Sequence, residues 1–185
     1  PLFRSVPTVE ETGELSEVNY WTGGKLTALE QDIEATIHRA EDDKKPLTIK
    51  DMKRLAENSL PEYDQRLDEI VVEAQMAIVS SQIRVNVADL AMQALEEQGF
   101  SVQDGTYEGE DMRNGFMAKA INREGSEVVV SVIPEENGNR MEVNSFEPHS
   151  RAPGELLKRS QEIARSMKGK GLNVSDVQTI SETPN

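Results

Sequence analysis

One long stretch without a helix-breaking residue constrains the fold of this chain more than any other feature. Residues 62–98 contain neither glycine nor proline, and this run is far longer than a strand. Ser59 and Glu62 stand at capping-box spacing, and Pro61 suits a first helical turn, where no amide donor is needed. Gly99 supplies the left-handed residue that often follows a helix. The sequence therefore predicts one long helix from Ser59 to Gly99.

Apolar or small side chains recur along this helix in alternating steps of four and three residues. This is the period of a heptad repeat, whose first and fourth positions face another helix. Long or branched side chains alternate with small ones, which lets a partner helix come close but buries less apolar area than leucines would. The predicted seam has the interface residues Leu67, Val71, Ala74, Ile78 and Val85, and it continues through Ser81, Ala88, Met92 and Leu95.

The segment around Val85 allows a second interpretation. Ile83, Val85 and Val87 alternate with polar residues as in a strand, but no turn residue flanks them, which favours a helix. From residue 83 onward a second apolar stripe opens through Ile83, Val87, Leu90 and Ala94. A helix that is apolar on two faces can continue the seam on one face and cover a sheet with the other. We therefore expect the globular core at this end of the helix.

The first residues of the chain show no apolar period. Residues 1–24 contain Pro1, Pro7 and a glycine pair, and we expect an extended arm or linker there. Trp21 is a side chain of the kind that anchors a loose segment on a partner, and it is a candidate interface residue. The alternative is that Trp21 folds back onto its own chain.

Two shorter helices are expected before the long one. A capping box formed by Thr27 and Glu30 predicts a helix that ends near residue 43, ahead of Pro46. Thr48 is placed to cap a second helix that ends near residue 58. Together with the start of the long helix, residues 25–82 would form a helical hairpin or coiled-coil-like arm.

The second half of the chain alternates between strand and turn signals. A helix is expected from Pro153 to Lys168, because apolar residues recur there at helical spacing. The predicted strands span residues 100–109, 115–122, 127–133, 140–146 and 172–180. The predicted fold class is α+β: a helical arm, then a small antiparallel or mixed sheet of four or five strands flanked by two helices. The compact domain would cover residues 83–181, followed by a tail over 182–185.

This order of elements resembles the core of the restriction-endonuclease-like nucleases, with "ALEEQGFSV" similar to their opening helix and strand. The resemblance implies a metal-binding aspartate at the start of the second strand, a role for Asp111. It also implies an acid and a lysine at the end of the third strand, where this chain has Ser131 and Ile133 instead. Without the second carboxylate and the lysine, Mg²⁺ and an attacking water have no complete site. The resemblance therefore implies at most an incomplete nuclease centre.

Catalytic and cofactor motifs are missing from the sequence. It has no nucleophile elbow, phosphate-cradling glycine motif or dinucleotide fingerprint. Of its two histidines, His38 falls on a charged helix face and His149 in a loop, where a lone histidine is usually incidental. Glu108, Glu110 and Asp111 form the one tight acidic cluster beside a strand and are weak candidates for a metal site. We expect a protein that is not an enzyme and binds no cofactor.

Charge is distributed unevenly. The net charge of −14 divides into −10 for residues 1–100 and −4 for residues 101–185. An acidic chain repels phosphate backbones unless it carries a local basic patch. The predicted last helix has such a patch, whose candidate nucleic-acid contacts are Lys158, Arg159, Arg165 and Lys168.

These observations favour a noncatalytic protein–protein interaction or assembly module. It would self-associate, as a homodimer or higher oligomer, or dock on a larger complex through the helical seam. The alternative is a nucleic-acid-associated protein with an incomplete nuclease-like domain that uses the basic last helix. The chain lacks cysteine and any run of about 18 apolar residues that could cross a membrane. We therefore expect a soluble, cytoplasmic protein.

Overall fold

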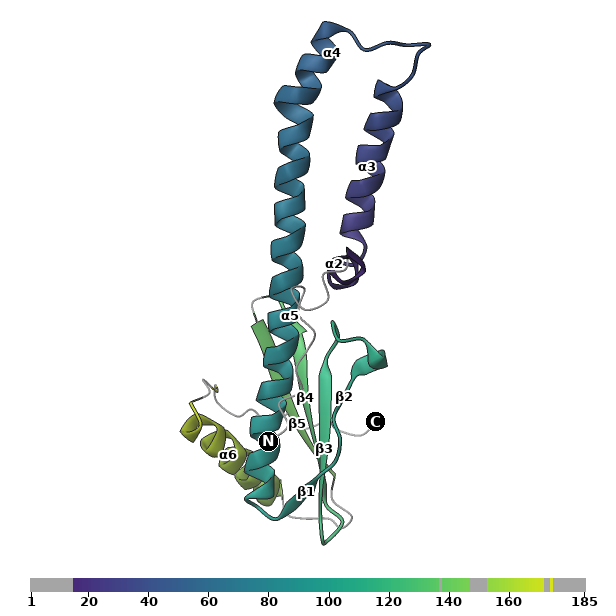
Figure 1. Cartoon of the computed structure of the whole chain (residues 1–185). Helices are drawn as coiled ribbons and strands as arrows, with labels where there is room; N and C mark the ends of the chain where they lie inside the picture. Colours follow the sequence, from purple (N-terminus) through teal and green to yellow (C-terminus); the bar gives the residue numbers. More distant parts are fainter. Residues whose placement is uncertain (1–14, 137, 147–152, 172–173, 175–185) are drawn as a thin grey trace. The chain divides into compact units, whose positions relative to one another are not determined.

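The computed structural model describes residues 15–136, 138–146, 153–171 and 174. They form an α+β fold, as predicted, with a long helix followed by a five-stranded antiparallel open sheet and a C-terminal helix (Figure 1). The chain divides into two compact units between Val79 and Ser80. We call the part before this boundary the helical unit and the part after it the sheet unit.

The helical unit begins with two helices, and a side chain of the first helix hydrogen-bonds to the N-terminus of the second. Residues 15–21, expected to be extended, form helix α2 (Leu15–Trp21), and α3 follows as Lys25–Ala40. The predicted capping box of Thr27 and Glu30 is not where α3 starts. Gly24 is the N-cap with φ 93°, and the side chain of Asn19 in α2 accepts a hydrogen bond from the backbone N–H of Thr27 at 3.2 Å. The cap thus comes from the preceding helix.

The predicted break before Pro61 does not occur. Helix α4 (Ile49–Arg54) continues through a single π-helical turn, η1 (Leu55–Ser59), directly into α5 (Leu60–Glu96). In η1 the backbone N–H of Leu60 bonds to the carbonyl of Leu55. A proline inside a helix lacks a donor and clashes with the carbonyl four residues earlier, and a π-turn relieves that clash. The helical path is therefore continuous from Ile49 to Glu96.

The other end of the long helix agrees with the sequence. Helix α5 ends at Glu96, and Gly99 takes a φ of 85°, as expected for the residue that ends a helix. The segment Ile83–Val87 is helical, so the strand alternative for it does not hold.

The sheet unit contains an antiparallel sheet of strand order β1-β3-β4-β5, with β2 also paired to β3. The predicted first strand is split into β1 and β2 around Gly105. A side-chain carbon at Gly105 would collide with the ring of Phe116, so this close approach requires glycine. The strands are β1 (Phe100–Val102), β2 (Thr106–Tyr107), β3 (Phe116–Asn122), β4 (Glu127–Glu135) and β5 (Gly138–Phe146), with the 3₁₀ turn η2 (Glu108–Glu110) after β2.

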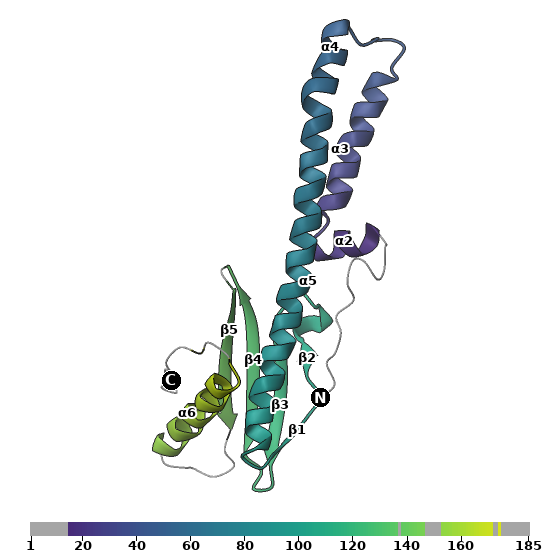
Figure 2. The same cartoon turned by 60° about the vertical axis from the view of Figure 1, so that its left-hand side comes forward.

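Helices α5 and α6 (Pro153–Gly169) cover the same face of this sheet (Figure 2). Alternate residues of β3 and β4 point into this layer, because successive strand side chains face opposite sides. Val174 also packs against the core, while the rest of the predicted last strand lies outside the described residues. The core is made of Val85, Ala88, Ala91, Met92 and Leu95 of α5, Phe100, Phe116, Ala118, Ala120, Val128, Val130 and Val132 of the sheet, and Ile163 and Met167 of α6.

A search of the described residues found no helix with the length and apolar character needed to cross a membrane.

Candidate functional site

Helix α3 lies antiparallel to the first half of α5 within the helical unit (Figures 1 and 2). Three polar contacts fix the pairing. Lys25 Nζ lies 2.6 Å from Glu73 Oε2, Arg66 Nη2 lies 2.8 Å from Asp32 Oδ2, and the hydroxyl groups of Thr36 and Tyr63 are 2.7 Å apart. The two residue numbers of each pair add up to nearly the same value, so the contacts share one antiparallel register. Exposed contacts of this kind contribute little stability, but they define which face of α5 meets α3.

The structure buries most of the predicted interface residues within the chain. Ala74 and Ile78 are buried in the helical unit, and Val85 lies in the core of the sheet unit. Trp21 is also buried, with its ring edge-on to that of Tyr20. These four side chains are thus covered within the chain and do not form an outer surface.

The other two predicted interface residues are less covered. Leu67 is 41% exposed, and Val71 is half-buried. Val71 lies near the Lys25–Glu73 contact at the base of the hairpin and Leu67 lies next to Arg66, while Ile37 and Leu60, which are nearer to its tip, are exposed. Exposure along this face of α5 therefore increases from Ala74 and Ile78 towards the tip of the hairpin.

The face of α5 opposite the seam carries exposed apolar side chains in the helical unit. Val72, Met76 and Val79 follow one another in steps of four and three, and each is about half exposed or more, with Met76 at 64%. We call these three residues the outer stripe. No charged residue occurs between Glu73 and Arg84, so the stripe adjoins an uncharged stretch. Exposed apolar residues are unremarkable singly, but a contiguous set marks a candidate interaction surface.

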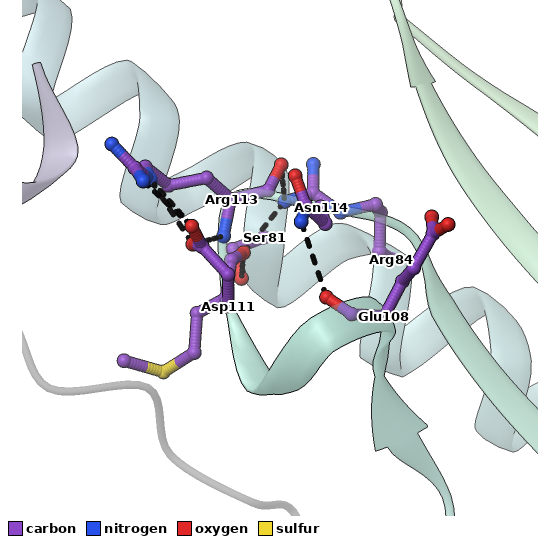
Figure 3. Close-up of polar contacts among 7 residues, drawn as sticks. Ser81, Arg84, Glu108, Asp111, Arg113 and Asn114 are labelled. Atoms are coloured by element: carbon purple, nitrogen blue, oxygen red, sulfur yellow. Dashed lines mark hydrogen bonds and ion pairs between the residues drawn. The ribbon is translucent and has the colours of Figure 1, made fainter. Parts of the chain in front are cut away.

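Arg84 forms the most unusual polar site of the sheet unit. Its side chain is only 2% exposed, and Figure 3 shows it beneath the loop that precedes β3. Nη2 donates to the backbone oxygens of Met112 at 2.9 Å and Arg113 at 3.3 Å, and Nη1 donates to Ser80 Oγ at 3.0 Å. Burial lowers the pKa of Arg84, and Nε has no hydrogen-bond partner in the described structure.

Ser81, three residues before Arg84 on α5, supports the same loop. Its hydroxyl donates to the backbone oxygen of Met112 at 2.8 Å and lies 2.9 Å from the hydroxyl of Tyr107. Arg84 and Ser81 therefore hold the loop backbone through its carbonyl oxygens. No ion pair to Arg84 is present in the described part of the chain. The contacts assign Arg84 a structural role, because Nη2 donates to main-chain oxygens and Nη1 to side-chain oxygens of its own chain.

The acidic residues predicted as weak metal ligands lie in this loop but do not converge. Asp111 forms an ion pair with Arg113 at 2.6 Å, and Asn114 donates to the backbone oxygen of Glu108 (Figure 3). Glu110 has a positive φ of 59°. Within the described residues no three acidic or histidine side chains are grouped as metal ligands would be.

The nuclease resemblance finds no support at its key positions. Asp111 precedes β3 and is held by Arg113, while Ser131 and Ile133 lie in β4. Strand β4 pairs antiparallel with both of its neighbours, β3 and β5. His149 lies outside the described residues.

The basic residues of α6 divide into two groups. Arg159 turns towards the sheet, where its guanidinium lies 5.1 Å from the ring centre of Phe100 and donates to Ser145 Oγ at 3.2 Å. Lys158, Arg165 and Lys168 are exposed and recur in steps of seven and three. These three cations therefore share one face of α6, without Arg159.

Comparisons with known proteins add no relative. No protein-family model matches the chain, and no similar curated protein or solved structure was found.

Sequence reasoning missed two of these features, although each leaves a signal. The steps from Val72 to Met76 and Val79 continue to Ile83, so the outer stripe is the earlier part of the second apolar stripe recognised from residue 83 onward. Arg84 is the single charged residue in an otherwise uncharged stretch of α5. A lone charge in an apolar context indicates burial with satisfied donors, since an unpaired buried charge is costly.

Proposed function

We propose that this protein is a noncatalytic protein–protein interaction module that self-associates through the outer face of α5 in the helical unit. The observation that carries the proposal is the outer stripe, Val72, Met76 and Val79, exposed on a helix whose opposite face is already covered. The predicted role as an assembly module is retained, but the proposed surface differs from the predicted seam. The absence of catalytic motifs from the sequence supports the same class of function.

A second copy of the chain is the proposed occupant of the outer stripe. Association removes apolar side chains from water, and a two-fold arrangement gives each copy the same gain. Three side chains per copy cannot bury the roughly 800 Å² per partner that is usual in a stable interface. Further surface of the helical unit must therefore take part, and the association is expected to be weak if the stripe acts alone.

Sedimentation velocity of the full chain over a range of concentrations tests this proposal. A reversible dimer of the 20.6 kDa chain is expected, and the double variant Met76→Asp, Val79→Asp should remain monomeric because it places carboxylates in the interface. The matched control Gln31→Asp, Ala35→Asp adds the same two charges to exposed positions of α3.

The two variants separate interface effects from charge and folding effects. The control should dimerise like the natural chain, and circular dichroism should show equal helicity for all three proteins. A natural chain that stays monomeric at every concentration would refute the proposal. Equal loss of dimer in both variants would also refute it, because the effect would then be one of net charge.

A second candidate function is nucleic-acid association through α6. It is favoured by the exposed face that Lys158, Arg165 and Lys168 share. Three cations give few phosphate contacts, and the chain as a whole carries a charge of −14. Fluorescence anisotropy with duplex DNA at low salt distinguishes this candidate: binding that disappears on Lys158→Ala, Arg165→Ala, Lys168→Ala substitution supports it, and no binding removes it.

A further inference from the structure

The tip of the helical unit combines exposed apolar and basic side chains. In α4, Ile49 is 79% exposed and Met52 is 52% exposed. Lys50, Lys53 and Arg54 are also exposed. The one acidic residue of α4, Asp51, is already used: its carboxylate accepts hydrogen bonds from the backbone and the hydroxyl of Thr48 in a capping box. Helix α4 therefore presents apolar side chains beside cations, while the neighbouring α3–α4 loop also carries the exposed acidic residues Glu41, Asp42 and Asp43.

The half of α5 that belongs to the helical unit has the opposite charge. Leu60–Val79 contains five acidic residues and one basic residue. The basic residue, Arg66, pairs with Asp32, and Glu73 pairs with Lys25. Asp68 and Glu69 are exposed and form no ion pair in the described part of the chain. They lie about one turn before the outer stripe, which thus has acidic side chains at one end.

These two surfaces match each other in both polarity and charge. In α4, Ile49 and Met52 lie next to cations. In the half of α5 that belongs to the helical unit, which we call the stem, Val72, Met76 and Val79 lie next to carboxylates. Opposite charges across an interface favour one register, while like charges disfavour others. Within one chain the two surfaces cannot meet, because Met52 and Met76 lie on one continuous helical path, 24 residues or about 36 Å apart.

We propose that two copies pair their helical units antiparallel, with the α4 tip of one copy against the acidic end and outer stripe of α5 in the other. This inference rests on the proposed self-association and specifies its geometry. A two-fold axis places Met52 of each copy near Val72 of its partner, about one helical turn from Met76, so both ends of the pair bury the same contacts. A parallel pairing would instead set the cationic α4 of one copy against the cationic α4 of the other, and the acidic first half of α5 against its own copy.

Site-specific crosslinking tests the direction of pairing. The chain contains no cysteine, so Met52→Cys and Met76→Cys each introduce a single thiol at an exposed position. A short bifunctional maleimide should crosslink an equal mixture of the two variants into a dimer. Each variant alone should give no dimer, because in the antiparallel pair its two thiols lie at opposite ends.

The outcomes separate this inference from the proposed function. Dimer formation by Met76→Cys alone would establish parallel pairing and overturn the inference, while self-association would stand. A sedimenting dimer without crosslinks in the mixture would overturn it as well. A chain that is monomeric by sedimentation would overturn both proposals.

Charge reversal provides a second test that needs no crosslinker. Lys53→Glu with Arg54→Glu should raise the dimer dissociation constant about tenfold or more by opposing Asp68 and Glu69 of the partner copy. Adding Asp68→Lys and Glu69→Lys to the same chain should restore dimerisation. The control Lys44→Glu, Lys45→Glu makes the same change of charge in the α3–α4 loop. Adding Asp68→Lys and Glu69→Lys to this control should not restore dimerisation. A rescue that fails while the protein stays folded would contradict the proposed contact.

Discussion

Arg84 shows how a single buried side chain can organise a loop. Its guanidinium has no acidic partner in the described structure, and its donors meet main-chain oxygens of Met112 and Arg113. Burial lowers its pKa because the low-dielectric surroundings disfavour the charge. The group nevertheless stays protonated at neutral pH, since an arginine titrates far above it. The loop carbonyls therefore have a permanent donor.

Removal of this donor should be costly. We expect Arg84→Ala to lower the free energy of unfolding by about 2–3 kcal/mol, because buried carbonyl oxygens lose hydrogen bonds from a charged group. The matched substitution Arg113→Ala breaks an exposed ion pair with Asp111 and should cost less than about 1 kcal/mol. Urea unfolding of both variants measures the difference. Equal losses of unfolding free energy in the two variants would show that the buried guanidinium of Arg84 stabilises the fold no more than the exposed one of Arg113.

At the scale of whole elements, local signals in the sequence identify the long helix but misplace its start. The absence of glycine and proline after Pro61 and the glycine at position 99 fix most of α5 correctly. Proline ordinarily marks a helix boundary, yet here the helix continues through Pro61, which lies in the first turn of α5, after the π-turn η1. A π-turn has no residue signature of its own, so it could not be anticipated. The start of α3 was missed for a similar reason, because its cap comes from Asn19 in another helix.

The candidate site was only partly predictable for a different physical reason. The heptad seam is visible in the sequence, but periodicity does not say whether the covering partner is another copy or the same chain. The structure covers Ala74, Ile78 and Val85 within the chain. The exposed positions then follow from helix geometry, because Val72, Met76 and Val79 lie on the opposite face of α5. Tertiary packing decides which of two apolar faces remains available.

The junction between the ends of α5 and α6 predicts a pH dependence. The side chains of Lys170 and Ser166 hydrogen-bond to Glu97, at 3.2 Å each, and lower the pKa of that carboxyl. A lowered pKa means that the folded state prefers the ionised form. The stabilisation is therefore present above the ordinary carboxyl pKa of 4.5 and is lost as the pH falls through the lower folded value.

An NMR titration of the Glu97 side chain checks this linkage. Lys170→Met should raise the pKa of Glu97 towards its ordinary value, because it removes the hydrogen bond that lowers this pKa most, together with the positive charge of Lys170. Lys119→Met breaks another exposed pair, with Glu127, and should leave Glu97 unchanged. An unaltered Glu97 titration in Lys170→Met would show that this contact does not form in solution.

At the scale of the whole molecule, the helical unit separates charge along its length. Its α4 tip carries three cations, whereas its α5 stem is acidic, and the chain has a net charge of −14. Self-repulsion of such a chain opposes any association that brings like surfaces together. Antiparallel pairing is the arrangement that turns this uneven distribution into attraction. The outer stripe and the tip then bury their apolar side chains in the same contact.

Methionine oxidation of the unaltered chain tests this account most directly. Thioether oxidation by excess peroxide depends on exposure, and Met52, Met76 and Met117 are all exposed in the single chain. Mass spectrometry can follow each residue as the protein concentration is raised. We predict that oxidation of Met52 and Met76 slows together as the dimer forms, while Met117 in β3 keeps a constant rate. Rates for Met52 and Met76 that do not change with protein concentration would contradict the account.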